Sequence, residues 1–255
     1  MGAAAHRPNV EPTSRYSREF EGISPEVGQQ IATGRQRKAS TVQAAARHSA
    51  FDIIRNEHRA IAAVVHCLEQ LLKEVRDDAL DPPFEVFELI LRYLAEFPDR
   101  FHHPKEDDFL FPALADRDPS VGEVIRELQE QHEDCVRKTA VLAKLLAAWK
   151  ADRMNGFAAF DQAARDYIAF QWEHIRLEET TILPAAREKL TETDWEAIDK
   201  AFDENDDPIF GANPQAAFNG LFRKIVATAP APWGLGTRHE TKRQNVLSRI
   251  GLGRK

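Results

Sequence analysis

The sequence predicts an all-α fold, an antiparallel up-down-up-down four-helix bundle with additional short C-terminal helices. Three observations predict it. Apolar residues recur at alternating steps of three and four over long stretches, which is the period of an amphipathic helix. The segments that join these stretches are short, and short connections favour antiparallel neighbours. No stretch of alternating apolar and polar residues indicates a strand.

The chain is expected to divide into three parts. Residues 1–50 show no sustained apolar period and are expected to form a flexible N-terminal arm. Residues 51–190 contain the four long helical patterns and are expected to form the bundle. Residues 191–255 are expected to form a helical extension and a tail.

The first two helices are expected over residues 51–76 and 84–110. An apolar stripe that begins at Phe51 marks the first of them, and two consecutive prolines precede the second. Pro98 and Pro104 fall inside the second pattern and are expected to kink or interrupt that helix.

The third helix is expected to open at Ser120, because Glu123 follows three residues later in a capping-box pattern. The fourth is expected from about residue 157 towards residue 190, with a bend at Pro184. Thr193 and Glu196 predict the cap of another short helix.

The end of the chain carries one more helical pattern. This last helix is expected over residues 214–226, after Asn213. The Pro- and Gly-rich segment from Ala229 onward is expected to be extended and partly disordered.

Composition limits the choice of partners and compartment. The 255 residues contain 34 Lys and Arg against 41 Asp and Glu, a net charge of −7, which argues against nucleic acid or an anionic membrane as partner. The two cysteines lie inside apolar helical patterns, so no disulfide framework is expected. No apolar run is long enough for a membrane span or a secretory signal, and we expect a cytoplasmic protein.

Histidine placement points to a metal site. Each of the four long helices carries one histidine at a position where the apolar stripe predicts a core residue. Two of these histidines have a glutamate four residues later, on the same helical face. In an antiparallel bundle, all four rings fall in the same half of the molecule and can converge. The six candidate metal ligands are His58, His102, Glu106, His132, His174 and Glu178.

Ligand chemistry narrows the identity of the metal. Four imidazoles and two carboxylates are too many for one tetrahedral zinc ion, but they suit two six-coordinate first-row ions. Glu106 and Glu178 are assigned bridging roles and the histidines terminal ones. Two iron ions, bridged by oxo or hydroxo, are the first choice, with manganese or zinc as alternatives.

The residues around these candidates resemble the hemerythrin-like, or HHE cation-binding, domain. The resemblance rests on NEHRAI around His58, FHHPKEDDFLFPAL at 101–114, LQEQHED around His132 and YIAFQWEHIRLEETTILP at 167–184. It covers about residues 51–190 and includes both spacing and order. The resemblance implies a four-helix bundle with a non-haem di-iron centre that binds O2 or related small molecules.

One departure from the family pattern concerns the third helix. Oxygen-carrying members have a second histidine four residues after the third-helix ligand, and this chain has Val136 there, with Leu128 four residues before. One ion is therefore expected to have an open position, filled by water or by a neighbour. In some members the residue directly after the second-helix histidine is a ligand, which makes His103 the leading candidate. The other neighbours considered are Glu57, Glu133 and Glu179.

Several side chains near the candidate ligands have alternative interpretations. The three neighbouring glutamates point about 100° away from the ligand beside them and are expected to be surface charges unless one is the extra ligand. Glu178 is favoured over Glu179 as the fourth-helix carboxylate, because variant domains use the four-residue step. Tyr167 is expected to be packed in the core, with a hydrogen bond to bound oxygen as the alternative.

Three functions fit these features. The first is a binding protein that binds or responds to O2, NO, peroxide or iron. The second is a di-iron enzyme that consumes peroxide or NO, and the third is a bundle whose metal only holds the helices together. The expected partner is a small diatomic ligand or peroxide, and a sensor would contact a protein through its N-terminal arm or C-terminal tail.

Overall fold

The computed structural model describes residues 49–203 and 214–239. Over these two ranges the chain forms helices and turns, with one isolated bridge between Pro230 and Gly236 in place of any strand. The all-α prediction is confirmed for this part of the chain. None of the helices described combines the length and apolar character needed to cross a membrane. The expected N-terminal arm lies almost wholly outside the described residues.

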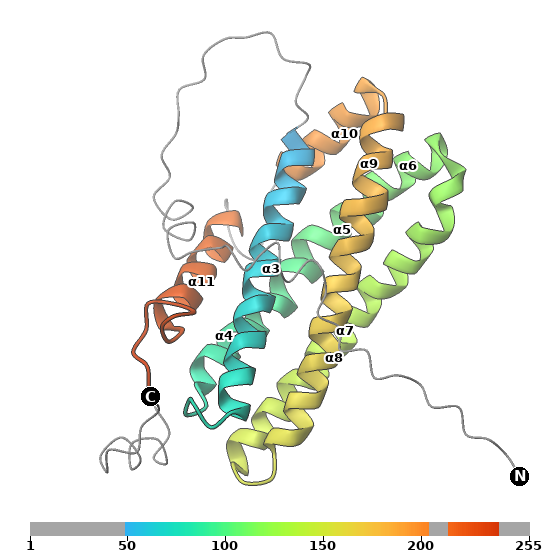
Figure 1. The fold of residues 1–255 in the computed structure, drawn as a ribbon. Coiled ribbons are helices and arrows are strands. Elements are labelled where there is room, and N and C mark those ends of the chain that lie inside the picture. Colours follow the sequence, from blue (N-terminus) through green and yellow to red (C-terminus); the bar gives the residue numbers. More distant parts are fainter. Residues whose placement is uncertain (1–48, 204–213, 240–255) are drawn as a thin grey trace, which may run out of the picture.

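Four long helical stretches lie side by side (Figure 1). The chain runs down α3 (Ser49–Arg76), up α4 (Phe84–Phe97) to α6 (Phe111–Arg117), down α7 (Gly122–Ala151) and up α8 (Phe157–Leu177) to α9 (Leu183–Lys189). α3 packs against α4 and α8, and α7 packs against the same two helices. Each stretch therefore has two neighbours, and the interior is enclosed by all four.

Two helix starts differ from the sequence-based expectation. The Asp118 side chain accepts a hydrogen bond from the backbone N–H of Ser120 and caps the short η3 (Pro119–Val121) before α7, so the capping box expected at Ser120 is wrong. In α10 (Glu192–Asp203), Thr191 and Asp194 form the reciprocal cap, instead of the pair that begins at Thr193. At both helix starts an aspartate side chain accepts the hydrogen bond of a free backbone N–H group: Asp118 from Ser120, and Asp194 from Thr191.

The turn between α7 and α8 depends on a glycine. A Cβ atom at Gly156 would lie 2.3 Å from the Cα of Trp149, so no other residue fits without a shift of the backbone. Trp149 is 1 % exposed and packs on Phe87 and Phe160 in the core. The glycine thus lets α8 start directly against the end of α7.

Three π-helical segments interrupt the second and fourth stretches: η1 (Pro98–His102), η2 (Glu106–Leu110) and η4 (Glu178–Ile182). At the end of each segment, a backbone N–H group donates a hydrogen bond to the carbonyl oxygen five residues earlier. The donors are His103, Phe111 and Leu183. A proline follows each of these donors and lacks the N–H for the next bond, so a one-residue change of helical register costs little there. The prolines that were expected to bend or break the helices lie beside these π-helical turns instead. The short α5 (His103–Lys105) lies between η1 and η2.

The core consists of two hydrophobic clusters. The lower cluster joins the end of α3, α4, the end of α7 and the start of α8. The upper cluster joins the start of α3 with η2, α6, α7 and α9, and Trp195, Ile198 and Phe202 of α10 cover it. The predicted ligands lie along the chain between members of the two clusters, so a polar layer separates them.

The described C-terminal part packs against two of the four long helical stretches. α11 (Pro214–Thr228) lies against α4, and residues 229–239 turn back towards α3. Trp233 packs edge-on against His66, and Arg238 forms an ion pair with Glu74 at 2.7 Å. The expectation of an extended tail is therefore wrong for residues 229–239, because an aromatic and an arginine attach this segment to α3.

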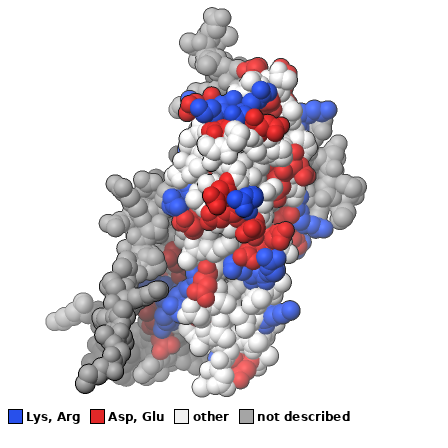
Figure 2. All heavy atoms as spheres, turned by 90° about the vertical axis from the view of Figure 1, so that its right-hand side faces the viewer, with Lys and Arg blue, Asp and Glu red and all other residues white. Residues whose placement is uncertain are grey.

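The outer faces of α7 and α8 carry ion pairs within one helix, among them Arg137 with Asp134 and Arg176 with Glu173. Figure 2 shows acidic and basic side chains interspersed on one face of the molecule. Exposed pairs of this kind contribute little to stability, because water and salt screen their charges.

Candidate metal centre

The six residues predicted from the sequence meet in the polar layer. Each is no more than 5 % exposed. Four helical stretches supply them: His58 from α3, His102 and Glu106 from η1 and η2, His132 from α7, and His174 and Glu178 from α8 and η4.

The first group of donors comprises His58, His102, Glu106 and Glu178, and one ligand atom of each lies within 4.8 Å of the others. The Nε2 atom of His58 is 3.1 Å from Nε2 of His102 and 3.2 Å from Oε2 of Glu178. His102 Nε2 is 3.4 Å from Oε1 of Glu106. These four side chains can surround one cation.

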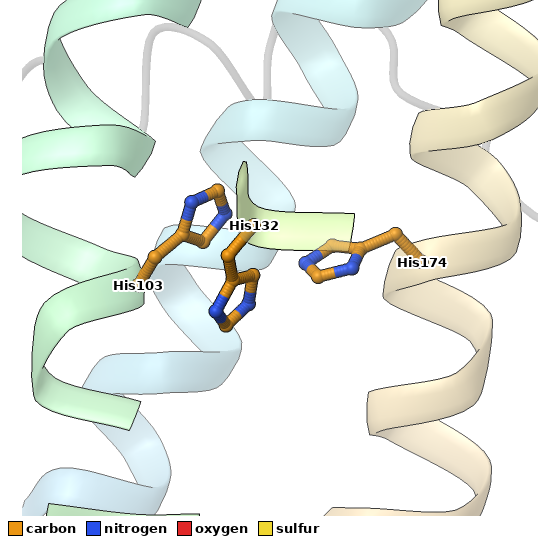
Figure 3. Close-up of side chains that lie close together, drawn as sticks. All are labelled: His103, His132 and His174. Carbon is orange, nitrogen blue, oxygen red and sulfur yellow. The ribbon is translucent and has the colours of Figure 1, made fainter. Parts of the chain in front are cut away.

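The second group is formed by His103, His132 and His174, whose ring nitrogens also lie within 4.8 Å of one another. Figure 3 shows the three rings converging from different helices. The rings of His103 and His132 stack with centroids 4.0 Å apart. His103, the leading candidate for an additional ligand in the sequence, therefore lies beside two of the predicted histidines.

Both carboxylates span the two groups. Glu106 places Oε1 3.4 Å from His102 and Oε2 3.7 Å from His132. Glu178 places Oε2 3.2 Å from His58 and Oε1 3.5 Å from His174. Each glutamate thus presents one oxygen to each group, as a bridging carboxylate does.

The spacing of the donor atoms fits metal coordination. Ligands about 2.1 Å from one ion lie about 3.0–3.4 Å apart at octahedral or tetrahedral angles, and the distances above are close to this range. Hydrogen bonds are also missing where they would be expected in a metal-free polar core. The buried atoms without a hydrogen-bond partner include Glu106 Oε2, His132 Nε2, His174 Nε2 and both carboxylate oxygens of Glu178. Each such atom costs about 1–3 kcal/mol when left unpaired, and a bound cation removes that cost.

A ring of hydrogen bonds around the cluster orients four of the histidines. In each bond the Nδ1–H group donates to a side chain on a neighbouring helical stretch, at 2.9–3.0 Å. The bonds join His102 to Glu57, His132 to Asp107, His174 to Gln131 and His58 to Glu179. With its proton on Nδ1, each ring presents the Nε2 lone pair to the centre, which is the arrangement usual for metal-binding histidines.

Without a metal, protons balance the charge of the buried carboxylates. Burial opposes a charge on His132, but Asp107 and Glu178 outweigh it and raise the pKa of His132 to about 10. Burial likewise opposes a charge on His58, and Glu106, Glu178 and Glu179 still raise its pKa well above the ordinary value. Protons on these two rings therefore occupy the place that a cation would take.

The other histidines of the cluster behave in the opposite way. Burial lowers the pKa of His174 to about 4 and that of His103 well below its ordinary value. Both rings are thus neutral at pH 7, the form in which imidazole binds metal.

Two expectations about neighbouring residues are wrong. Val136 is 53 % exposed and lies on the outer side of α7, so this position does not face the metal cluster. Glu57 is buried and Glu179 half-buried, and both accept hydrogen bonds from histidines of the next helix rather than forming surface charges. Glu133 is exposed, as expected.

Tyr167 is buried, and its hydroxyl accepts a hydrogen bond from Gln171 at 2.9 Å. The expectation of a packed tyrosine is met.

Sequence reasoning missed Asp107 and Gln131, because contacts between helices do not appear in a single-helix period. A signal was present, since each partner in the ring is adjacent in sequence to a predicted ligand.

Comparisons with known proteins bear on the family of the chain. Uncharacterized proteins of Mycobacterium tuberculosis and Mycobacterium bovis are 22 % identical to the chain over 201 residues, which is 76 % of this chain and 74 % of theirs. No solved structure matches the chain. The family model described as hemerythrin HHE cation-binding domain matches residues 49–186, which include all five histidines and both glutamates of the cluster. The chain belongs to the hemerythrin HHE cation-binding domain family.

Proposed function

We propose that the protein holds two metal ions in the cluster, iron in the first place, with manganese or zinc as alternatives, and binds or responds to O2, NO, peroxide or iron. His58 and His102 hold one ion; His103, His132 and His174 hold the other; Glu106 and Glu178 bridge them. This proposal includes the antiparallel up-down-up-down topology of the four-helix bundle and a cytoplasmic location.

The observation that carries the proposal is the division of each carboxylate between the two histidine groups. A single-ion site would draw both oxygens of Glu106 or Glu178 towards one group. Here each glutamate has an oxygen within 3.8 Å of a histidine in both groups. Imidazole and carboxylate donors without a thiolate suit first-row ions such as iron and manganese.

The division of donors differs between the two ions. Counting both glutamates for each ion, the protein supplies four donors beside His58 and His102 and five beside His103, His132 and His174. First-row ions of this kind commonly take six ligands. The ion with four protein donors is therefore the one that accepts a small exogenous ligand. The missing histidine at position 136 had instead suggested an open position at the ion beside the third helix.

When bound, a pair of iron ions supplies reversible electron transfer and affinity for small oxygen- and nitrogen-containing ligands. The protein's part is to keep both ligand sets in place through the ring of Nδ1–H bonds and to surround them with apolar side chains. Ile54, one turn before His58, is fully buried and belongs to the cluster that covers this side.

A second candidate function is a di-iron enzyme that consumes peroxide or NO. The open position beside His58 favours an enzyme as much as a ligand-binding protein, since a substrate would enter at the same ion. A signalling role would add a protein partner, contacted through residues 1–50 or the C-terminal tail.

The experiment that separates these functions starts from the reduced, iron-loaded protein under anaerobic conditions. Its optical spectrum is recorded after O2, NO and peroxide are each added in turn. A reversible spectral change at stoichiometric ligand supports binding, and continued consumption of peroxide or NO supports an enzyme. A spectrum that responds to none of the three contradicts the proposal.

A further inference from the structure

His103 is the exception among the five histidines of the cluster. The other four donate Nδ1–H to a neighbouring helix at 2.9–3.0 Å and so form the ring described above. Nδ1 of His103 is buried without a hydrogen-bond partner, and the atom closest to it among its ionic contacts is Oδ1 of Asp99, at 3.4 Å. Asp99 Oδ1 is also buried and has no hydrogen bond.

A third potential metal ligand, Cys135, lies beside Asp99 and His103. The Sγ atom of Cys135 lies within 4.8 Å of ligand atoms of both Asp99 and His103. Asp99 and His103 are four residues apart on the second helical stretch, and Cys135 faces them from α7, one turn after His132. The side chains of Asp99 and His103 are 8 % and 5 % exposed, and Cys135 is 1 % exposed. A carboxylate and a thiol that are not assigned to either ion thus converge on His103, which belongs to the second group.

Hydrogen-bond donors surround the sulfur atom. The Gln171 amide donates to Sγ of Cys135 at 3.0 Å, and the Tyr167 hydroxyl lies 3.6 Å from it. Both donor residues are 1 % exposed. Burial keeps Cys135 a thiol without a metal, and such donors stabilise the sulfur once a cation has replaced its proton.

We propose that Asp99, His103 and Cys135 form a further cation site, beside the two-metal cluster, for a thiolate-binding divalent ion such as zinc. A mixed sulfur, nitrogen and oxygen set is one that zinc accepts. Two ligands about 2.0–2.1 Å from a tetrahedral ion lie about 3.3 Å apart, which agrees with the 3.4 Å between His103 Nδ1 and Asp99 Oδ1. On binding, the ion replaces the thiol proton of Cys135, and that proton is released to solvent.

His103 can belong to both sites because imidazole has two nitrogen atoms on different edges of the ring. One ring nitrogen lies with His132 and His174, while Nδ1 faces Asp99. This inference rests on the proposed function at one point only, because His103 is shared with the two-metal cluster.

A route for the ion is also present. A groove of about 680 Å³ runs between α4 and α7, and Asp99 lies in its wall together with Thr139 and several alanines. The groove reaches the surface near Glu88 and Lys150, which are exposed. A hydrated cation can therefore approach the Asp99 carboxylate and take the remaining ligand from water.

Cobalt binding tests the site. The two-metal cluster contains no thiolate, so a near-ultraviolet thiolate-to-cobalt absorption band reports only on Cys135 and its partners. We expect the full chain, titrated anaerobically with Co2+, to show this band and to bind three equivalents. Cys135→Ser should lose the band and one equivalent, and Asp99→Asn should weaken the band. Cys67→Ser, which removes the other buried cysteine, should leave both unchanged.

The outcomes separate this inference from the proposed function. A wild-type protein that binds two cobalt ions without the band overturns the further site and leaves the two-metal proposal intact. A band together with only one bound ion supports the further site and contradicts the two-metal cluster. His58→Ala should reduce the cobalt bound by the cluster while the band persists.

A measurement on the wild-type chain avoids dependence on the folding of Cys135→Ser. X-ray absorption of the protein loaded with three zinc ions should show sulfur at about 2.3 Å, about one third of a sulfur neighbour per zinc on average. Zinc with only nitrogen and oxygen neighbours would mean that Asp99 is simply a weak hydrogen-bond acceptor for His103, and the inference would be wrong.

Discussion

Glu57 offers a direct test of the hydrogen-bond ring, because the sequence gives no reason to distinguish it from Glu133. Each is adjacent in sequence to a predicted ligand. Glu57 is 5 % exposed and its Oε2 accepts a hydrogen bond from Nδ1 of His102 at 2.9 Å, whereas the Glu133 side chain is 76 % exposed. The substitution Glu57→Ala removes the acceptor from a buried ring, and Glu133→Ala is its matched control.

The magnitude follows from the lost contact. Removal of the acceptor leaves the Nδ1–H group of His102 buried and unpaired, which costs about 1–3 kcal/mol in stability. Loss of such an outer partner typically lowers metal affinity about 10- to 100-fold, which is about 1.4–2.7 kcal/mol. Glu57→Gln keeps an oxygen acceptor but loses the charge, so it should fall between Glu57→Ala and the wild type.

The assay is an anaerobic competition between the protein and a chelator of known Fe2+ affinity, combined with thermal unfolding in the absence of metal. Glu57→Ala should release iron at a lower chelator concentration and unfold at a lower temperature, and Glu133→Ala should match the wild type in both. If Glu57→Ala holds iron as tightly as Glu133→Ala, the ring does not orient the ligands and the reasoning fails.

Three further results are expected. His102→Ala or Glu106→Ala should remove at least one metal ion and lower the free energy of unfolding by several kcal/mol, while His239→Ala changes neither; equal metal content by elemental analysis in all three would place the site elsewhere. Val136→His should leave metal content and the rate of autoxidation unchanged, because this position is 53 % exposed; slower autoxidation would show that α7 turns it towards the metal. Metal affinity should rise with pH through the neutral range and above, because the raised pKa of His132, about 10, means that the metal must displace a proton; calorimetry in buffers of different ionisation enthalpy measures the protons released, and a value of zero would contradict this.

The predictable part of the site depends on regular helices. His58 and His132 lie on the apolar stripes of α3 and α7, and the period of an undistorted helix is enough to place them in the core. The all-α fold follows from the same period, because an amphipathic stripe must be buried against another helix.

The unpredicted part arises where helices are distorted or where they meet. In a regular helix His103 points about 100° away from His102, but η1 ends between them, and both rings face the cluster. Val136 lies one turn after His132, yet the buried stripe of α7 continues through Cys135 and Thr139, which leaves Val136 on the groove side. Partners such as Gln131 were missed because the contact that gives them a role lies on another helix.

The central claim is that two ions, held by different numbers of histidines and bridged by Glu106 and Glu178, share one buried cluster. Elemental analysis and Mössbauer spectroscopy of the protein reconstituted with 57Fe test it most directly. We expect two iron ions per chain whose spectra show magnetic coupling in the oxidised state, with two inequivalent sites in the reduced state. A single uncoupled iron, or one zinc ion that iron does not replace, would contradict the claim.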